Sequence, residues 1–160
     1  MYNNIELQNI SKKYQGFELK NISFNVPQGC IVGLIGENGA GKTTTIKAIL
    51  NITKSDGTIK IFGKDIRNNE KTIREEIGVV LDDSFLSTYL NTKQINSIMR
   101  DAYKKWDENI YFNLLKQFDL PTNKLIKDFS SGMKMKLKIA VAISHKPKLL
   151  ILDEPTSGLD

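Results

Sequence analysis

Cysteine and histidine are almost absent from this chain, and it has no long apolar run. Cys30 is the only cysteine among the 160 residues, and His145 is the only histidine. A single cysteine excludes an internal disulfide and suits a reducing cytoplasm. Residues 137–152 form the most apolar stretch, but lysines, a histidine and a proline interrupt it, so it is not a membrane helix. Because residues 1–6 show no secretory signal pattern, we expect a soluble, cytoplasmic protein.

The charge is positive but spread along the chain. A net charge of +5 raises the question of a nucleic-acid or anionic-lipid partner. The nearest approach to a cluster is Lys134, Lys136 and Lys138, whose alternate spacing cannot line one narrow helical face. We interpret the lysines as a solvated surface and expect no nucleic-acid partner. Hydrophobic residues at 40% and charged residues at 26% fit one globular core.

Apolar periodicity predicts a mainly parallel α/β sheet. Residues 4–10 and 19–26 alternate apolar with polar, as half-buried antiparallel strands do. Cys30–Ile35 is a continuous apolar run, which predicts a parallel strand covered on both faces. Further short strands are expected at 58–62, 77–81 and 149–152.

Helices are expected between these strands. Residues 42–51 and 92–119 have apolar residues at helical spacing, and the second stretch is interrupted around Trp106. Ser130 is a candidate N-cap for a helix that runs to Ser144. Alternation of strands and helices favours an α/β fold.

A glycine-rich loop follows the apolar run and opens the first helix. It matches the pattern G-x-x-x-x-G-K-[ST] and comprises Gly36, Glu37, Asn38, Gly39, Ala40, Gly41, Lys42 and Thr43, with Thr44 next. Its glycines allow backbone N–H groups to face phosphate oxygens, and the helix adds the positive end of its dipole. We expect Lys42 to reach the β- and γ-phosphates and Thr43 to ligate Mg²⁺. The alternative is a glycine turn beside an exposed lysine.

Two acids follow the last apolar strand. Asp153 and Glu154 come directly after residues 149–152, at the strand end where α/β sheets place their ligand crevice. We expect Asp153 to hold Mg²⁺, through water, and Glu154 to polarise the water that attacks the γ-phosphate. Strands often end in acids without any function. The two acids therefore indicate a catalytic site only because the glycine-rich loop is also present.

Together with Phe129–Met133 and Ser157–Asp160, these motifs make the chain resemble the nucleotide-binding domain of ABC transporters along its whole length. The resemblance implies a P-loop NTPase fold with an N-terminal antiparallel β subdomain and an inserted helical subdomain. It implies ATP and Mg²⁺ as cofactors and a head-to-tail dimer with two nucleotides between the protomers. In that dimer, Ser130 and the Gly132 N–H would grip the γ-phosphate held by the other protomer.

The resemblance also implies a division of the chain and a membrane partner. Residues 1–81 and 145–160 would form the ATP-binding core, and about 82–144 the helical subdomain with the signature helix. Transmembrane permease subunits would hold the protein at the inner face of the cell membrane. Candidate residues for the permease groove, or for the subdomain's own core, are Phe85, Leu86, Tyr89, Leu90 and Trp106. Tyr14 lies where the family stacks a ring on adenine, although it can equally close an edge strand.

Three departures from the family pattern bear on activity. The signature reads Ser130-Ser-Gly-Met133, which resembles subunits that serve bacterial ABC-2 export permeases. Asp82 stands where a glutamine usually contacts Mg²⁺ and the attacking water; a carboxylate can still ligate the metal but cannot donate a hydrogen bond when ionised. The family's switch histidine would lie beyond Asp160, so the 160 residues alone are not expected to sustain turnover.

Two alternatives to an ATP-driven exporter stay open. One is a soluble ABC-type ATPase of the repair or translation class, although neither a long coiled coil nor a second nucleotide domain is present. The other is a nucleotide-dependent binding module that does not turn over. His145 precedes the acidic strand, so it is not the switch histidine, and we interpret it as a helix C-terminal residue that faces the helix dipole.

Overall fold

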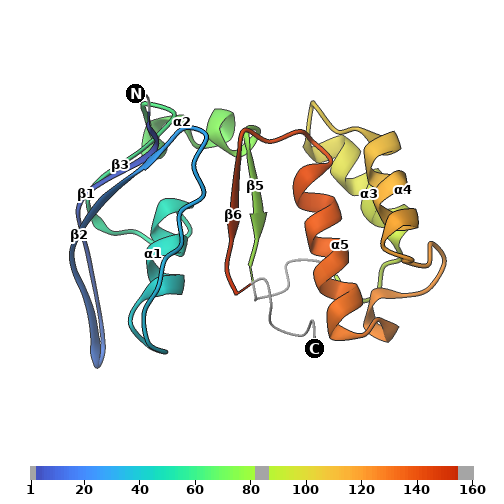
Figure 1. The fold of residues 1–160 in the computed structure, drawn as a ribbon, viewed down its shortest axis with the longest axis horizontal. Helices are drawn as coiled ribbons and strands as arrows, with labels where there is room; N and C mark the ends of the chain where they lie inside the picture. The colour runs from blue at the N-terminus through green and yellow to red at the C-terminus, as the bar shows by residue number, and fades with distance from the viewer. Residues whose placement is uncertain (1–2, 82–86, 155–160) are drawn as a thin grey trace. The chain divides into compact units, whose positions relative to one another are not determined.

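The computed structural model describes residues 3–81 and 87–154. The chain forms two compact units, residues 1–73 and residues 74–160. Figure 1 shows the elements of each. Every helix in the described part of the chain is too short or too polar to span a bilayer.

The first unit is built on an antiparallel sheet in the order β2-β1-β3-β4. Its strands are β1 (Asn3–Tyr14), β2 (Phe17–Pro27), β3 (Asp56–Ile61) and β4 (Lys64–Asp65). Leu7 pairs with both Phe24 of β2 and Ile59 of β3, and its side chain is buried. The two antiparallel strands predicted from alternation are therefore confirmed, and they are longer than predicted.

An irregularity in β1 explains why its buried positions do not alternate strictly. Ile5, Leu7 and Ile10 are buried, and both pairings of β1 shift register after residues 7–8. Asn9 has a φ of 53°, which is the left-handed conformation of a bulged residue. Gly57 lies opposite, where a Cβ would collide with the Gln8 and Asn9 carbonyl oxygens.

The prediction of a buried strand at Cys30–Ile35 is wrong for this structure. These residues form no strand, and Ile31 and Ile35 are 103% and 95% exposed. An apolar run becomes a strand only when neighbouring strands take up its backbone N–H and C=O groups. Neither sheet of the described chain includes this segment.

Two helices complete the first unit. Helix α1 (Lys42–Ile49) matches the predicted helix, and it ends before Asn51, whose φ of 55° is left-handed. Helix α2 (Ile66–Arg74) was not predicted, because only Ile66 and Ile73 of its residues are buried and the rest are mostly polar. A non-helical backbone at Asn69 interrupts it.

The second unit contains a parallel pair of strands, β5 (Ile77–Val80) and β6 (Leu149–Leu152), with Ile77 opposite Leu149. Helix α5 (Ser131–Ile143) packs against β5 (Figure 1). Gly78 makes this close approach possible, because a Cβ there would collide with the Ala142 carbonyl oxygen. The predicted strands and the predicted helix are confirmed here.

The helices α3 (Thr92–Ala102) and α4 (Glu108–Gln117) and the short η1 (Ile126–Asp128) form a hydrophobic core with α5. Tyr111 is fully buried in it and donates a hydrogen bond to the Thr92 carbonyl oxygen. Asn91 and Gln94 form a capping box at the start of α3. The predicted interruption near Trp106 separates α3 from α4.

His145 lies at the C-terminal end of α5, as predicted, and its ring is buried there. It follows α5 but is only 1% exposed, and its ring stacks on Tyr103 at a centroid distance of 4.2 Å. Its Nε2 lies 3.0 Å from the Ile77 carbonyl oxygen, so Nε2 carries the proton and donates it. Burial lowers the pKa of His145, although the Ile77 and Val141 carbonyls and the charges of Glu75 and Glu76 oppose this effect.

We expect the second unit to lose stability as the pH falls below the ordinary histidine pKa of 6.5. Below this pH the unfolded chain binds a proton at His145 that the folded chain does not readily bind. The free energy of unfolding therefore decreases as the pH falls. Melting between about pH 7.5 and about pH 5.5 tests this, because no other side chain ordinarily titrates there. The variant His145→Phe keeps a ring for Tyr103 and should melt at the same temperature at both values. If the melting temperature of that variant depends on pH as strongly as that of the wild type, His145 is not the cause.

Candidate functional site

The glycine-rich loop forms a turn at the start of α1. Gly39 and Gly41 have φ values of 85° and 94°, which side chains rarely adopt. The Ala40 N–H donates to the Glu37 carbonyl oxygen at 3.1 Å and closes the turn. No side chain caps α1, and no acid lies in its first turn. The first N–H groups of the helix are therefore available to an anion.

The basic side chain of the loop is folded back onto it. Lys42 Nζ donates to the carbonyl oxygens of Gly36 and Glu37 at 2.8 and 3.0 Å. The ammonium is thus held above the turn, where it can exchange these carbonyl groups for phosphate oxygens. Thr43 is exposed in the first turn and Thr44 is half-buried. Thr45 instead donates its hydroxyl to the Gly41 carbonyl oxygen.

The loop lies directly against the β1–β2 hairpin. A Cβ at Gly41 would be 2.9 Å from both Phe17 Cζ and Leu19 Cδ1, and the φ of 94° would strain any other residue. Tyr14 ends β1 at the same hairpin and is 43% exposed. The structure therefore places the predicted aromatic residue and the predicted phosphate loop in one unit.

The two predicted acids lie at the carboxyl end of the parallel strands. Asp153 is 4% exposed, and its N–H donates to the Val80 carbonyl oxygen at 2.8 Å. Glu154 is exposed and has a φ of 47°, a left-handed conformation that costs roughly 1–3 kcal/mol in a non-glycine residue. Strain of this kind clusters at functional sites. The strand pair thus buries one acid and turns the next outward.

The predicted helix cap at Ser130 is confirmed. Its hydroxyl accepts a hydrogen bond from the Met133 N–H at 3.2 Å, and α5 begins at the next residue. Ser130 is exposed, Gly132 is half-buried, and no acid lies in the first turn of α5. This helix end can also accept an anion from outside the chain.

One of the lysines that the sequence assigns to the solvated surface is buried. Lys138 is 7% exposed, and its Nζ donates to the Leu81 carbonyl oxygen at 2.9 Å. This burial corrects the interpretation of Lys138 as a solvated lysine. Its helical spacing from Met135 and Ala142, both buried, is the signal that would have placed it on the inner face of α5.

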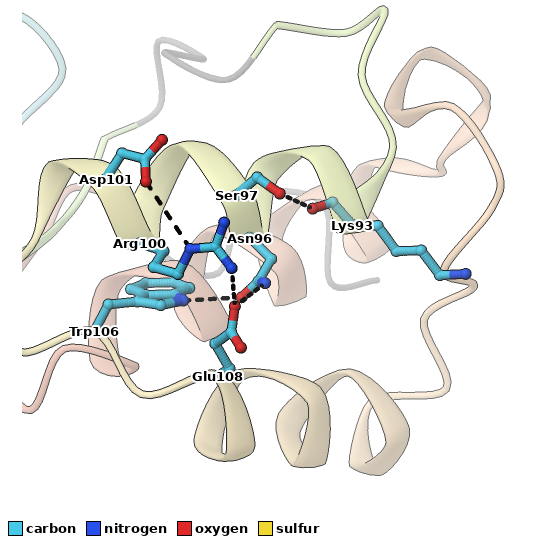
Figure 2. A network of polar contacts seen from close by, with 7 residues as sticks. All are labelled: Lys93, Asn96, Ser97, Arg100, Asp101, Trp106 and Glu108. Atoms are coloured by element: carbon cyan, nitrogen blue, oxygen red, sulfur yellow. Dashed lines mark hydrogen bonds and ion pairs between the residues drawn. The ribbon is translucent and has the colours of Figure 1, made fainter.

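The candidate groove residues divide between core and surface. Leu90 and Trp106 pack against the helical core, and Tyr89 is 75% exposed. Trp106 Nε1 donates to Asn96 Oδ1 at 2.9 Å, and Asn96 donates to Glu108 at 2.6 Å (Figure 2). Asn96 of α3 therefore bonds both to the tryptophan and to the start of α4. Phe85 and Leu86 lie outside the described residues.

Several other expectations also fall outside the described residues. Asp82 and Ser157–Asp160 are among these positions. The loop with Lys42 and Thr43 belongs to the first unit, whereas Asp153, Glu154 and Ser130 belong to the second. Among the described residues, no three histidine, cysteine or acidic side chains cluster as metal ligands.

Comparison with known proteins identifies the family. The family model described as "ABC transporter" matches residues 19–157. The ABC transporter ATP-binding protein YtrB of Bacillus subtilis is 35% identical over 98% of this chain and 54% of its own length. The bacitracin transport ATP-binding protein BcrA of Enterococcus faecalis is 37% identical over 98% of this chain and 52% of its own. The chain thus spans about half the length of these curated relatives.

A solved structure has the same fold. The ATP-binding subunit of an ABC transporter superposes with a TM-score of 0.86 and 32% sequence identity. The match covers 96% of this chain and 67% of that one.

Proposed function

This chain belongs to the ABC transporter family of ATP-binding domains, and we propose that it binds Mg-ATP through residues 36–44 and supplies ATP hydrolysis to a separate membrane permease. The observation that carries the proposal is the uncapped start of α1 with the Lys42 ammonium held over the loop. This arrangement of donors suits the triphosphate of ATP. ATP also supplies the phosphoryl group that is transferred to water.

Each residue has a defined task in this proposal. The N–H groups of Gly39, Gly41 and Lys42 bind phosphate oxygens, and the Lys42 ammonium neutralises the β- and γ-phosphates. The Thr43 hydroxyl and the Asp153 carboxylate are the hard oxygen ligands that Mg²⁺ prefers, with Asp82 as a third candidate. The Glu154 carboxylate accepts a proton from the attacking water.

The start of α5 supports a partnership between two protomers. The exposed Ser130 and the half-buried Gly132 lie at a helix terminus without an acid in its first turn, which suits a γ-phosphate bound to another copy of the domain. We infer a head-to-tail dimer on the cytoplasmic face of a permease. Because relatives are named for bacitracin transport, and because the Ser-x-Gly-Met signature resembles export subunits, we propose export as the direction.

We expect Mg-ATP to raise the melting temperature of the 160-residue chain. Ligand at a hundred times its Kd adds about 2.7 kcal/mol to the free energy of unfolding. For a domain of this size, the shift is about 5–10 °C. AMP, which lacks the two outer phosphates, serves as the control and should give a much smaller shift. Equal shifts with AMP and Mg-ATP would contradict recognition through the triphosphate.

A further inference from the structure

The Tyr14 ring is exposed and yet held in place. Its hydroxyl lies 3.1 Å from Thr53 Oγ1. Lys12 Nζ lies 5.5 Å from the ring centroid, and the Phe17 ring lies at 6.4 Å. An exposed tyrosine at the end of a strand needs none of these contacts for solubility. A ring that is 43% exposed and fixed at its hydroxyl is preorganised to receive a flat ligand.

Thr53 is itself fixed to the end of α1. The N–H groups of Ile52 and Thr53 both donate to the Lys47 carbonyl oxygen, at 2.9 and 3.3 Å. Asn51 has a left-handed backbone, and its side chain donates to Glu70 Oε2 of α2 at 3.0 Å. The Thr53 backbone therefore has a defined position relative to the helix, and its hydroxyl lies within hydrogen-bond distance of the Tyr14 hydroxyl.

Helix α1 thus connects two parts of one ligand site. It begins at Lys42 in the phosphate loop, and the chain beyond its last residue carries Thr53, which contacts Tyr14. At the other end, Gly41 lies against Phe17 and Leu19 of the hairpin that carries Tyr14. The hairpin is therefore anchored near both ends of the helix.

The resemblance to the family implies that the Tyr14 ring stacks on the base of the nucleotide whose phosphates bind at residues 36–44. We propose that Thr53 is a positioning residue, which holds this ring in place through its hydroxyl. This inference rests on the proposed function. Stacking on an aromatic ring uses the face that every base has, so the platform contributes affinity for the base and none for the phosphates.

Calorimetric titration of the full chain with two ligands, Mg-ATP and Mg-tripolyphosphate, tests the inference. Thr53→Val keeps the size of the side chain and removes the hydroxyl, and Tyr14→Phe keeps the ring and removes its hydroxyl. Each is expected to raise the Kd for Mg-ATP by about threefold to tenfold, the effect of one hydrogen bond. Neither should change the Kd for Mg-tripolyphosphate, which has no base.

Three further variants define the mechanism. The double variant should lose no more affinity than either single one, because both remove the same hydrogen bond. Thr53→Ser should bind Mg-ATP as the wild type does, since it retains the hydroxyl. Thr72→Val makes the same chemical change at an exposed position of α2 and should leave both Kd values unchanged.

The outcomes separate the inference from the proposed function. Unchanged Mg-ATP binding in Thr53→Val, or equal weakening of both ligands, would overturn the positioning role. If Tyr14→Ala binds Mg-ATP as the wild type does, the ring is not a platform, and the inference fails while the phosphate loop stands. If the wild type binds neither ligand, the proposed function fails as well.

Discussion

Replacing Lys42 with alanine is expected to remove most of the stabilisation that Mg-ATP gives to this chain. The Lys42 ammonium is the only side-chain cation in the loop of residues 36–44. A charge-assisted hydrogen bond contributes about 1.5–3 kcal/mol, so loss of contacts to two phosphates should weaken binding on the order of a hundredfold or more. At an ATP concentration of a hundred times the wild-type Kd, stabilisation would then decrease from about 2.7 to about 0.4 kcal/mol.

The control must separate binding from folding, because Lys42 also donates to the Gly36 and Glu37 carbonyl groups without a ligand. Melting of the variant without nucleotide measures that structural contribution. Lys71→Ala removes the same charge from an exposed position of α2 in the same unit, and it should keep the full Mg-ATP shift. A Lys42→Ala shift equal to that of Lys71→Ala would rule out the phosphate-loop assignment.

Replacing Glu154 with glutamine should separate ATP binding from ATP hydrolysis in the intact protein. Glutamine keeps the size and shape of the side chain but cannot accept the proton of the attacking water at neutral pH. Loss of a general base lowers the rate by about 10²–10⁴-fold. Binding of Mg-ATP should be retained, and sizing in the presence of ATP should show a dimer that persists.

Phosphate release under single-turnover conditions measures this effect. Glu18→Gln makes the same substitution at an exposed position of β2 and should hydrolyse ATP as the wild type does. Wild-type turnover in Glu154→Gln would place the base elsewhere, and Asp82 and Asp83 would be the first candidates to replace.

Elements with a strong local signal were predictable from the sequence. Ser130 was identified as a cap because a hydroxyl residue precedes an apolar periodic stretch, and its bond to the Met133 N–H confirms the assignment. The continuous apolar residues 149–152 predict a strand, and β6 has these limits. The turn glycines at 39 and 41 have the left-handed backbone that the loop pattern requires.

Features that depend on distant partners were not predictable in the same way. Cys30–Ile35 is as apolar as β5, but apolar character does not supply a neighbouring strand. His145 and Lys138 are polar residues that the fold buries, each bonded to a carbonyl group of the β5 segment, at Ile77 and Leu81. The Tyr14–Thr53 contact joins residues 39 positions apart, and neither residue predicts the other.

The central claim is that the backbone of residues 36–44 binds the triphosphate, and hydrogen–deuterium exchange with and without saturating Mg-ATP tests it most directly. Exchange reports the protection of individual backbone segments. Residues 36–44 lie in an exposed loop and the first turn of α1, so their amides should exchange fast without ligand. We predict that Mg-ATP slows exchange across this segment more than in any strand of either sheet. Binding of Mg-ATP, established by calorimetry, without slowed exchange at residues 36–44 would contradict the claim.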